Sequence, residues 1–346
     1  MLSATASRNT LYRKTLGRMG WSMLLFIGLF FLFTLISETC QSVIDNQSSQ
    51  LTPFWSSLVM ASYGLLSAIC YMTPFFLTGI FYHLISRHAH TERILYEPRL
   101  PREFPLLILA GMTILTTGAY INSLFCNLIG YSMPEDMVVA QNYDRPSVII
   151  MYMTVSLAPA FAEEFLFRGV FYTNLRPFGR TQAVLISAFL FALMHQNIAQ
   201  LFYTFVAGIA MALMYEITGS IWCGVFFHMF NNQLSVINEV LYYGGAGEAA
   251  TPYLSMFDAI RFILGAVSLI LLILYYMKKR TNDSQKQASG IWGYTDESLG
   301  RYERTLSASE VWKGVLNPGM IIFTAVTCVL MGLTWILLIV INAGGV

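Results

Sequence analysis

Two adjacent glutamates and an arginine lie inside one of the most apolar stretches of this sequence, FAEEFLFRGVFY at Phe161–Tyr172. Ionisable side chains within such segments are costly and usually face a protein interior or a water-filled cavity. Glu164 and Arg168 are four residues apart, so on a helix they share one face and can pair. Glu163 points about 100° away from Glu164 and is left without that partner. An unpaired carboxylate in this setting can act as a base that takes a proton from water.

Two further stretches place polar side chains in apolar surroundings. The first is FALMH, which ends at His195, and the second is HMFNN, from His228 to Asn232. His195 could orient a water molecule or ligate a metal that activates it. His228 and Asn232 are four residues apart and could both donate hydrogen bonds to a developing oxyanion. Together with Glu163, these side chains could hydrolyse an amide bond without a serine or cysteine nucleophile.

Structural roles are the alternative for each of these residues. A buried Glu–Arg pair by itself can simply lock helices together, and a single histidine in a membrane helix is often only a hydrogen-bonding group. The combination of two histidines with an unpaired glutamate is harder to explain structurally and favours a functional site. The sequence contains neither the G-x-S-x-G pattern of serine hydrolases nor the H-E-x-x-H pattern of zinc proteases.

The composition indicates a membrane protein. Of 346 residues, 56% are hydrophobic and only 11% are charged, whereas soluble proteins carry about a quarter charged residues. The net charge of +1 gives no reason to expect a nucleic-acid partner. The five cysteines are scattered without C-x-x-C spacing, so neither a disulfide framework nor a structural zinc site is indicated.

The elements that must position these side chains are predicted to be membrane-spanning helices. A spanning helix needs roughly 20 mostly apolar residues, and the fold class predicted is an all-α, polytopic bundle of 8–9 transmembrane helices around a membrane-embedded cavity. The fourth segment is expected to be tilted or kinked at Pro159. The predicted segments are 19–37, 57–85, 104–130, 147–175, 181–197, 199–217, 219–241, 256–277 and 319–343.

All three stretches are expected at similar depth, well inside their segments. At a rise of roughly 1.5 Å per residue, Glu163 and His195 lie about 20 Å from the basic end of their helices. His228 and Asn232 lie about 13 to 20 Å from Gly219 by the same measure. These depths fall near the middle of a hydrocarbon core of roughly 30 Å, so the side chains can meet in one cavity.

Basic residues recur at every second crossing, beginning at the N-terminus. The positive-inside rule therefore predicts an integral, multi-pass protein with a cytoplasmic N-terminus, and we favour a bacterial cell membrane. The predicted units are N-terminal helices 1–146, a catalytic core 147–245, a helix 256–280, a polar cytoplasmic insert 281–318 and a C-terminal helix 319–346. Within the insert, Ser307 and Glu310 predict a capping box for a short interfacial helix that carries Val311, Trp312 and Leu316.

The order Glu-Glu-x-x-x-Arg, Phe-x-x-x-His and His-x-x-x-Asn resembles the CPBP family. These are the CAAX proteases and bacteriocin-processing membrane enzymes, also called the ABI family or type II CAAX prenyl endopeptidases. The resemblance covers Glu163 to Asn232, and each motif is complete on a separate predicted helix. It implies an all-helical membrane fold and an endopeptidase that acts on a membrane-associated protein or peptide, at or in the lipid bilayer.

The resemblance also implies roles for individual residues. Glu163 corresponds to the general base and His195 to a residue that positions the water, while His228 and Asn232 correspond to the oxyanion side. Supporting positions are expected at Glu164, Arg168 and Phe191. The mechanism is left open between glutamate with water alone and a divalent metal such as zinc, whose ligands would be Glu163, His195 and His228.

Two other classes of function remain as alternatives. Membrane Glu, His and Arg side chains also suit a proton-coupled transporter, although the sequence shows no inverted repeat. A non-catalytic scaffold that docks a membrane partner in the cavity is the third possibility. The substrate and the oligomeric state are not readable from the sequence.

Overall fold

The computed structural model describes residues 2–48, 52–86, 94, 100–130, 143–283 and 306–344. Regular secondary structure in these residues is helical, as predicted. Backbone groups in a bilayer have no water to bond with, so long apolar runs satisfy their N–H and C=O groups within the helix itself. The predicted insert 281–318 lies mostly outside the described residues.

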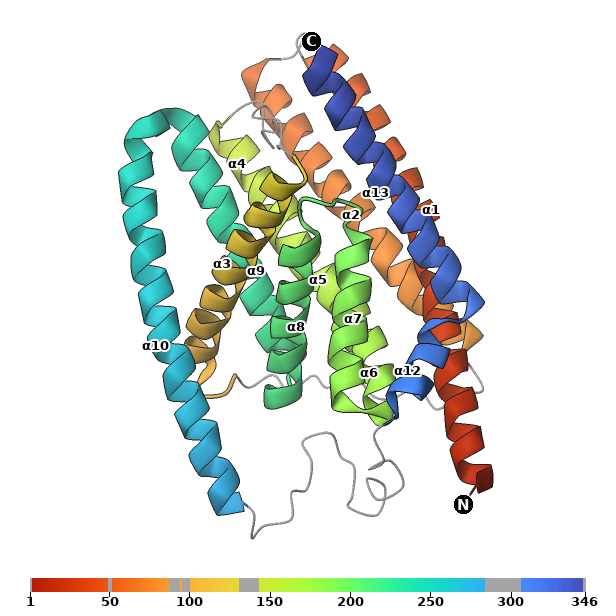
Figure 1. The fold of residues 1–346 in the computed structure, drawn as a ribbon. Helices are drawn as coiled ribbons and strands as arrows, with labels where there is room; N and C mark the ends of the chain where they lie inside the picture. Colours follow the sequence, from red (N-terminus) through yellow and green to blue (C-terminus); the bar gives the residue numbers. More distant parts are fainter. Residues whose placement is uncertain are drawn as a thin grey trace.

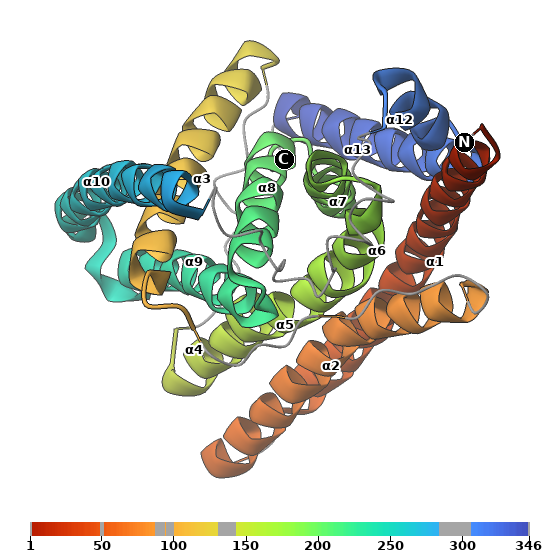
Figure 2. The same ribbon diagram turned by 90° about the horizontal axis from the view of Figure 1, so that it is seen from below.

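Three long helices form one side of the molecule (Figures 1 and 2). Helix α1 (Leu2–Ser48) packs along α2 (Pro53–Ile85), and α13 (Pro318–Gly344) crosses α1 on another face. The α1–α13 crossing is close because Gly20 of α1 meets the backbone of Gly319. This side of the bundle brings α2 against the segment that carries Glu163.

The opposite side consists of α3 (Phe104–Leu128) and α10 (Thr251–Asp283), which pack along each other. Between the two sides lie α7 (Arg180–Met194), α8 (Leu201–Thr218) and α9 (Ile221–Leu241). Helices α8 and α9 are joined by a tight turn at Gly219, whose φ of 64° lies in the left-handed region that glycine adopts without strain.

The helices account for the predicted membrane segments. Seven stretches of the described residues are long and apolar enough to cross a membrane. One of them, Ile221–Lys278, contains both α9 and α10, and α7 is a shorter apolar helix. The N-terminus, α6 and the C-terminal end of α10 lie at the same end of the bundle, as the alternation of basic clusters requires (Figure 1).

The predicted segment 181–197 is wrong at its C-terminal end. Helix α7 has 15 residues and ends at Met194, so it is about 22 Å long. His195 therefore lies at the end of this helix, and not within it as the sequence suggested. A short helix can end at membrane depth here because the polar groups beyond it lie within the protein, on a cavity wall.

The fourth predicted segment is a broken helix. It begins at α4 (Arg145–Met151), where Asp144 caps the helix by accepting from the N–H of Ser147. A π-helical turn then leads into α5 (Ala158–Glu164). The predicted irregularity at Pro159 is present, because this π-helical turn ends immediately before α5.

A second π-helical turn, Phe165–Tyr172, follows α5. It contains Arg168 and leads into α6 (Thr173–Leu175). Wide turns of this kind reposition side chains within a helix and are frequent at functional sites.

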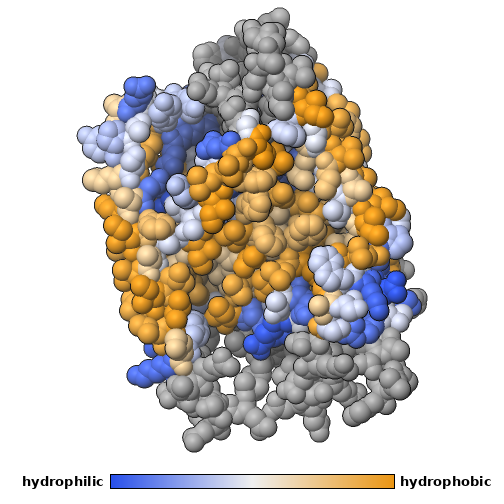
Figure 3. All heavy atoms as spheres, in the orientation of Figure 1, coloured by the Kyte–Doolittle hydropathy of each residue, from blue (hydrophilic) through white to orange (hydrophobic). Residues whose placement is uncertain are grey.

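The short helix predicted after the insert is present as α12 (Ala308–Val315). Ser307 and Glu310 form the predicted capping box. The helix packs on the start of α1, where Asn9 donates to Glu310 across 2.7 Å. Figure 3 shows an apolar belt over the middle of the face in view, with hydrophilic residues towards the ends. Exposed aliphatic side chains along α10 and α13 contribute to the lipid-facing surface. The chain is thus an integral, multi-pass membrane protein.

Candidate active site

Glu163 lies at the end of α5 and is only 3% exposed. Its two carboxylate oxygens have different surroundings. Oε1 accepts a hydrogen bond from the hydroxyl of Tyr71 on α2. Oε2 has no partner at hydrogen-bond distance among the described residues and lies 3.8 Å from Nε2 of His228. Oε2 of Glu164 is likewise buried without a partner, but of the two glutamates only Glu163 lines the cavity, which suits a group that must accept a proton.

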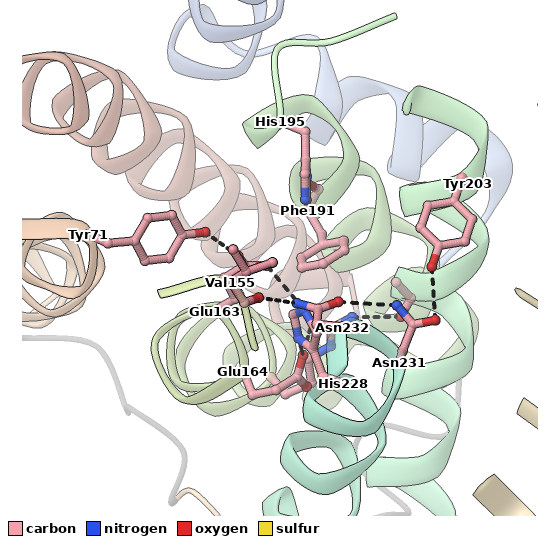
Figure 4. A network of polar contacts seen from close by, with 12 residues as sticks. Tyr71, Val155, Glu163, Glu164, Phe191, His195, Tyr203, His228, Asn231 and Asn232 are labelled. Carbon is pink, nitrogen blue, oxygen red and sulfur yellow. Dashed lines mark hydrogen bonds and ion pairs between the residues drawn. The ribbon is translucent and has the colours of Figure 1, made fainter. Parts of the chain in front are cut away.

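His228 contacts both glutamates from α9 (Figure 4). Its Nδ1 lies 3.3 Å from Oε1 of Glu164, while its Nε2 faces Glu163. The imidazole is therefore held at one nitrogen and presents the other to the cavity. This arrangement fixes which edge of the ring can serve a substrate.

Glu164 and Arg168 form the ion pair that their spacing predicts. The Nη1–Oε1 distance is 2.7 Å, and the two side chains are 1% and 0% exposed. Arg168 also donates to the backbone carbonyl of Gly208 on α8 and stacks over the ring of Phe191 on α7, 4.6 Å from its centroid. One cation thus links the Glu-Glu segment to two neighbouring helices.

The backbone of α9 lies close to the Glu164–Arg168 pair. A Cβ at Gly224 would lie 2.7 Å from Oε2 of Glu164, which is too short for a carbon–oxygen contact. Glycine at this position therefore lets α9 bring His228 against the two glutamates without displacing the Glu164 carboxylate.

His195 reaches the site from the C-terminal end of α7. Its Nδ1 lies 2.9 Å from the backbone carbonyl of Phe191, which orients the ring. The ring of Phe191 packs edge-on against both histidines, with centroids 5.0 Å from His195 and 6.0 Å from His228. Phe191 therefore forms the spacer that separates the two imidazoles.

Asn232 is held by a chain of hydrogen bonds. Its side-chain amide donates to the backbone carbonyl of Val155 across 3.0 Å, and its oxygen accepts from Asn231 across 3.1 Å. Tyr203 of α8 donates to Asn231 in turn, across 3.0 Å. Pro159 has no N–H to offer the Val155 carbonyl four residues earlier, so Asn232 satisfies an acceptor that the helix cannot.

These side chains line one cavity of about 420 Å³. The cavity wall includes Glu163, His195, His228 and Asn232, so the structure brings the four predicted catalytic residues together. Glu164 and Arg168 lie behind the wall. The remaining lining combines apolar side chains with hydroxyl and amide groups, and the latter are Tyr71, Thr154, Gln200, Tyr203, Thr204, Asn231 and Ser235.

Sequence reasoning missed Tyr71, Tyr203 and Asn231. Tyr71 and Tyr203 are single aromatic residues in apolar runs, and nothing in their spacing relates them to the three motifs. Asn231 stands beside Asn232 in the third stretch, but helical geometry points it away from His228. Its contact with Asn232 arises from side-chain reach and not from a shared helix face.

The predicted zinc ligands do not form a metal site in this geometry. Among the described residues, no three His, Cys, Asp or Glu side chains are grouped closely enough to hold a metal ion. Nδ1 of each histidine faces another protein group, the carbonyl of Phe191 for His195 and the carboxylate of Glu164 for His228, as is also usual for histidines that ligate a metal through the other nitrogen.

A comparison with protein families matches residues 145–234 to the model described as type II CAAX prenyl endopeptidase Rce1-like. No curated protein and no solved structure shows significant similarity to the chain. The matched segment runs from the start of α4 to the middle of α9 and contains all three motifs. It confirms the resemblance predicted from those motifs. The segment 145–234 is thus similar to the Rce1-like type II CAAX prenyl endopeptidases.

Proposed function

We propose that this protein is an intramembrane endopeptidase in which Glu163 activates the attacking water. The observation that carries the proposal is the asymmetry of the Glu163 carboxylate. Oε1 accepts a hydrogen bond, while Oε2 is buried without a hydrogen-bond partner and lies close to His228, and Glu163 is one of the residues that line the cavity. The family of the segment 145–234 supports peptide-bond hydrolysis as the reaction.

In the proposed step, Glu163 Oε2 takes one proton from a water molecule between it and the scissile carbonyl. The water oxygen forms a bond to the carbonyl carbon and gives a tetrahedral intermediate. The carbon–nitrogen bond then breaks, and the proton held by Glu163 passes to the leaving nitrogen. The products are a carboxylic acid and an amine, which exchange a proton to give a carboxylate and an ammonium group, and Glu163 returns to its starting state.

The histidines and Asn232 surround the place where this intermediate would form. His195 is oriented through Nδ1, which leaves Nε2 to position the water. His228 Nε2 and the second amide hydrogen of Asn232 are the donors proposed for the oxyanion. The proposed step is written with these side chains alone.

The proposed substrate is a membrane-associated protein or peptide, either of the CAAX type or one processed as bacteriocins are. The cavity is lined by residues of several helices of the bundle, so a substrate would reach it from the bilayer or along a polar opening. The proposed location is a bacterial cell membrane with a cytoplasmic N-terminus. The basic clusters and the common end of the bundle at which the N-terminus and the C-terminal end of α10 lie in Figure 1 support the orientation alone.

The test compares new peptide termini, by mass spectrometry, in membranes that contain equal amounts of wild-type protein or Glu163→Gln. Termini that are lost with Glu163→Gln support proteolysis and identify the substrate. Identical terminus profiles from two folded proteins, together with no cleavage of a prenylated CAAX peptide, would contradict the proposal. Ion flux in proteoliposomes would then favour a transporter, and partner binding that survives Glu163→Gln would favour a scaffold.

A further inference from the structure

The N-terminal helices contribute a side chain to the site although they lie outside the segment matched to the family. Tyr71 comes from α2, and its hydroxyl donates to Oε1 of Glu163. In Figure 4 the Tyr71 side chain points at the Glu163 carboxylate from the side opposite His228. We propose that Tyr71 is a positioning residue that orients Glu163 as the base. This inference rests on the proposed function.

The contact assigns different tasks to the two oxygens of Glu163. A carboxylate can rotate about its last side-chain bond and exchange its oxygens. A hydrogen bond to Oε1 holds one orientation, in which Oε2 remains near Nε2 of His228. Without the hydroxyl, either oxygen could turn towards α2, and the time spent in the productive orientation would fall.

The Tyr71 ring is itself fixed from two directions. It packs edge-on against Phe30 of α1, with centroids 5.8 Å apart, and against Phe75 one turn along α2, with centroids 5.3 Å apart. These contacts involve only the ring. The substitution Tyr71→Phe therefore keeps the packing and removes only the hydroxyl.

Tyr71 also separates two cavities. It lines the cavity that contains Glu163 and a second cavity of about 140 Å³ between α1 and α2. The second cavity is also lined by Ser37, Glu38 and Cys70. The ring is thus a shared wall, and its hydroxyl lies on the side of Glu163. Substitution by a small residue would remove both the hydroxyl and the ring, and loss of the ring would join the two cavities. Tyr71→Phe removes the hydroxyl alone and is therefore the informative variant.

A matched control is available on the same helix. Tyr63 lies about two turns before Tyr71, and its hydroxyl contacts Ser37 across 3.3 Å, not Glu163. The variant Tyr63→Phe removes the same group from the same helix. If the loss of any tyrosine hydroxyl from this helix changes the protein, both variants will show the change. If the hydroxyl of Tyr71 positions Glu163, only Tyr71→Phe will differ from wild type.

The first measurement is independent of any substrate. Infrared spectra of purified wild type and Glu163→Gln in detergent identify the carboxyl band of Glu163. The proposal expects this band to shift in Tyr71→Phe and to stay in place in Tyr63→Phe, because a hydrogen bond to one oxygen changes the carboxyl vibration. An unshifted band in Tyr71→Phe overturns the contact, whatever the activity shows.

The second measurement is the cleavage rate of a quenched fluorescent, prenylated CAAX peptide, or of the substrate identified by its termini. Tyr71→Phe is expected to lower kcat by roughly 10- to 100-fold with little change in KM, since the hydroxyl orients the base and binds no substrate. Tyr63→Phe is expected to match wild type. Equal kcat values for Tyr71→Phe and wild type overturn the positioning role. If no cleavage depends on Glu163, the proposed function fails and the positioning role fails with it, while the infrared result still decides the contact.

Discussion

The side-chain amide of Asn232 donates to the backbone carbonyl of Val155 across 3.0 Å. This bond joins two parts of the site that are far apart in sequence. Pro159 leaves the carbonyl four residues before it without its helical donor, and the motif asparagine of α9 supplies the replacement. The broken fourth helix and the position of Asn232 therefore depend on each other.

The first prediction concerns this bond. In Asn232→Ala the part-buried carbonyl of Val155 loses its side-chain donor, and the loss of one such hydrogen bond costs about 0.5–1.5 kcal/mol. We expect a loss of stability of that size together with a loss of cleavage, measured by unfolding in mixed micelles and by peptide hydrolysis. Asn238→Ala on the same helix is the control and should change neither. Wild-type stability in Asn232→Ala would contradict the structural part of the role.

The second prediction concerns the buried ion pair. Removing one partner from a fully buried pair leaves an uncompensated charge and costs about 3–5 kcal/mol. We therefore expect Arg168→Gln to unfold at a much lower temperature than wild type. Asp258→Asn breaks the partly exposed pair with Arg261 of α10 and should cost at most about 1 kcal/mol.

A double variant of the Glu164–Arg168 pair separates the cost of an unpaired buried charge from the loss of the contacts that the pair makes. Replacing both partners, as in Glu164→Met with Arg168→Met, removes both buried charges and should recover much of the stability lost in Arg168→Gln. It should not recover activity, because His228 would lose its contact with Glu164. A double variant no more stable than Arg168→Gln would argue against an uncompensated charge as the cause.

The third prediction uses the close approach at Gly224. The methyl group in Gly224→Ala would meet Oε2 of Glu164 at 2.7 Å, so the carboxylate or α9 must move. A shift of about 1 Å in a catalytic group can cost roughly 100-fold in rate, and we expect a loss of that order in kcat. Gly332→Ala in α13 is the control, since its methyl group meets nothing within 4 Å and alanine favours the helix. Equal activities of the two variants would show that α9 tolerates the displacement.

The fourth prediction distinguishes the two mechanisms that the family resemblance leaves open. If side chains alone activate the water, cleavage by purified protein should survive dialysis against a strong chelator, and metal analysis should find less than one equivalent of zinc. Activity that is lost on chelation and restored by zinc would instead support a site formed by Glu163, His195 and His228. Glu163→Gln serves as the inactive reference in both measurements.

Much of the fold could be predicted because a bilayer imposes simple rules. Apolar runs of spanning length must be helical, so the segments, the pairing of Glu164 with Arg168 and the capping box at Ser307 follow from spacing within one helix. The three family motifs were recognised from the order of residues along the chain, and the family match over residues 145–234 contains them. Helix α7 ends at Met194, before the polar residues His195, Gln196 and Asn197, whereas the predicted segment continued through them, and for this reason the position of His195 was wrong.

The sequence by itself determined which polar residues enter the membrane and which of them share a helix face. Only the tertiary structure decided which oxygen of Glu163 is held by Tyr71, and that His228 contacts both glutamates. It also decided that Asn232 bonds to Val155, which no spacing rule relates to it. The physical reason is that contacts between helices depend on their crossing and on close approaches such as Gly224 against Glu164. The periodicity of a single helix carries no information about such contacts.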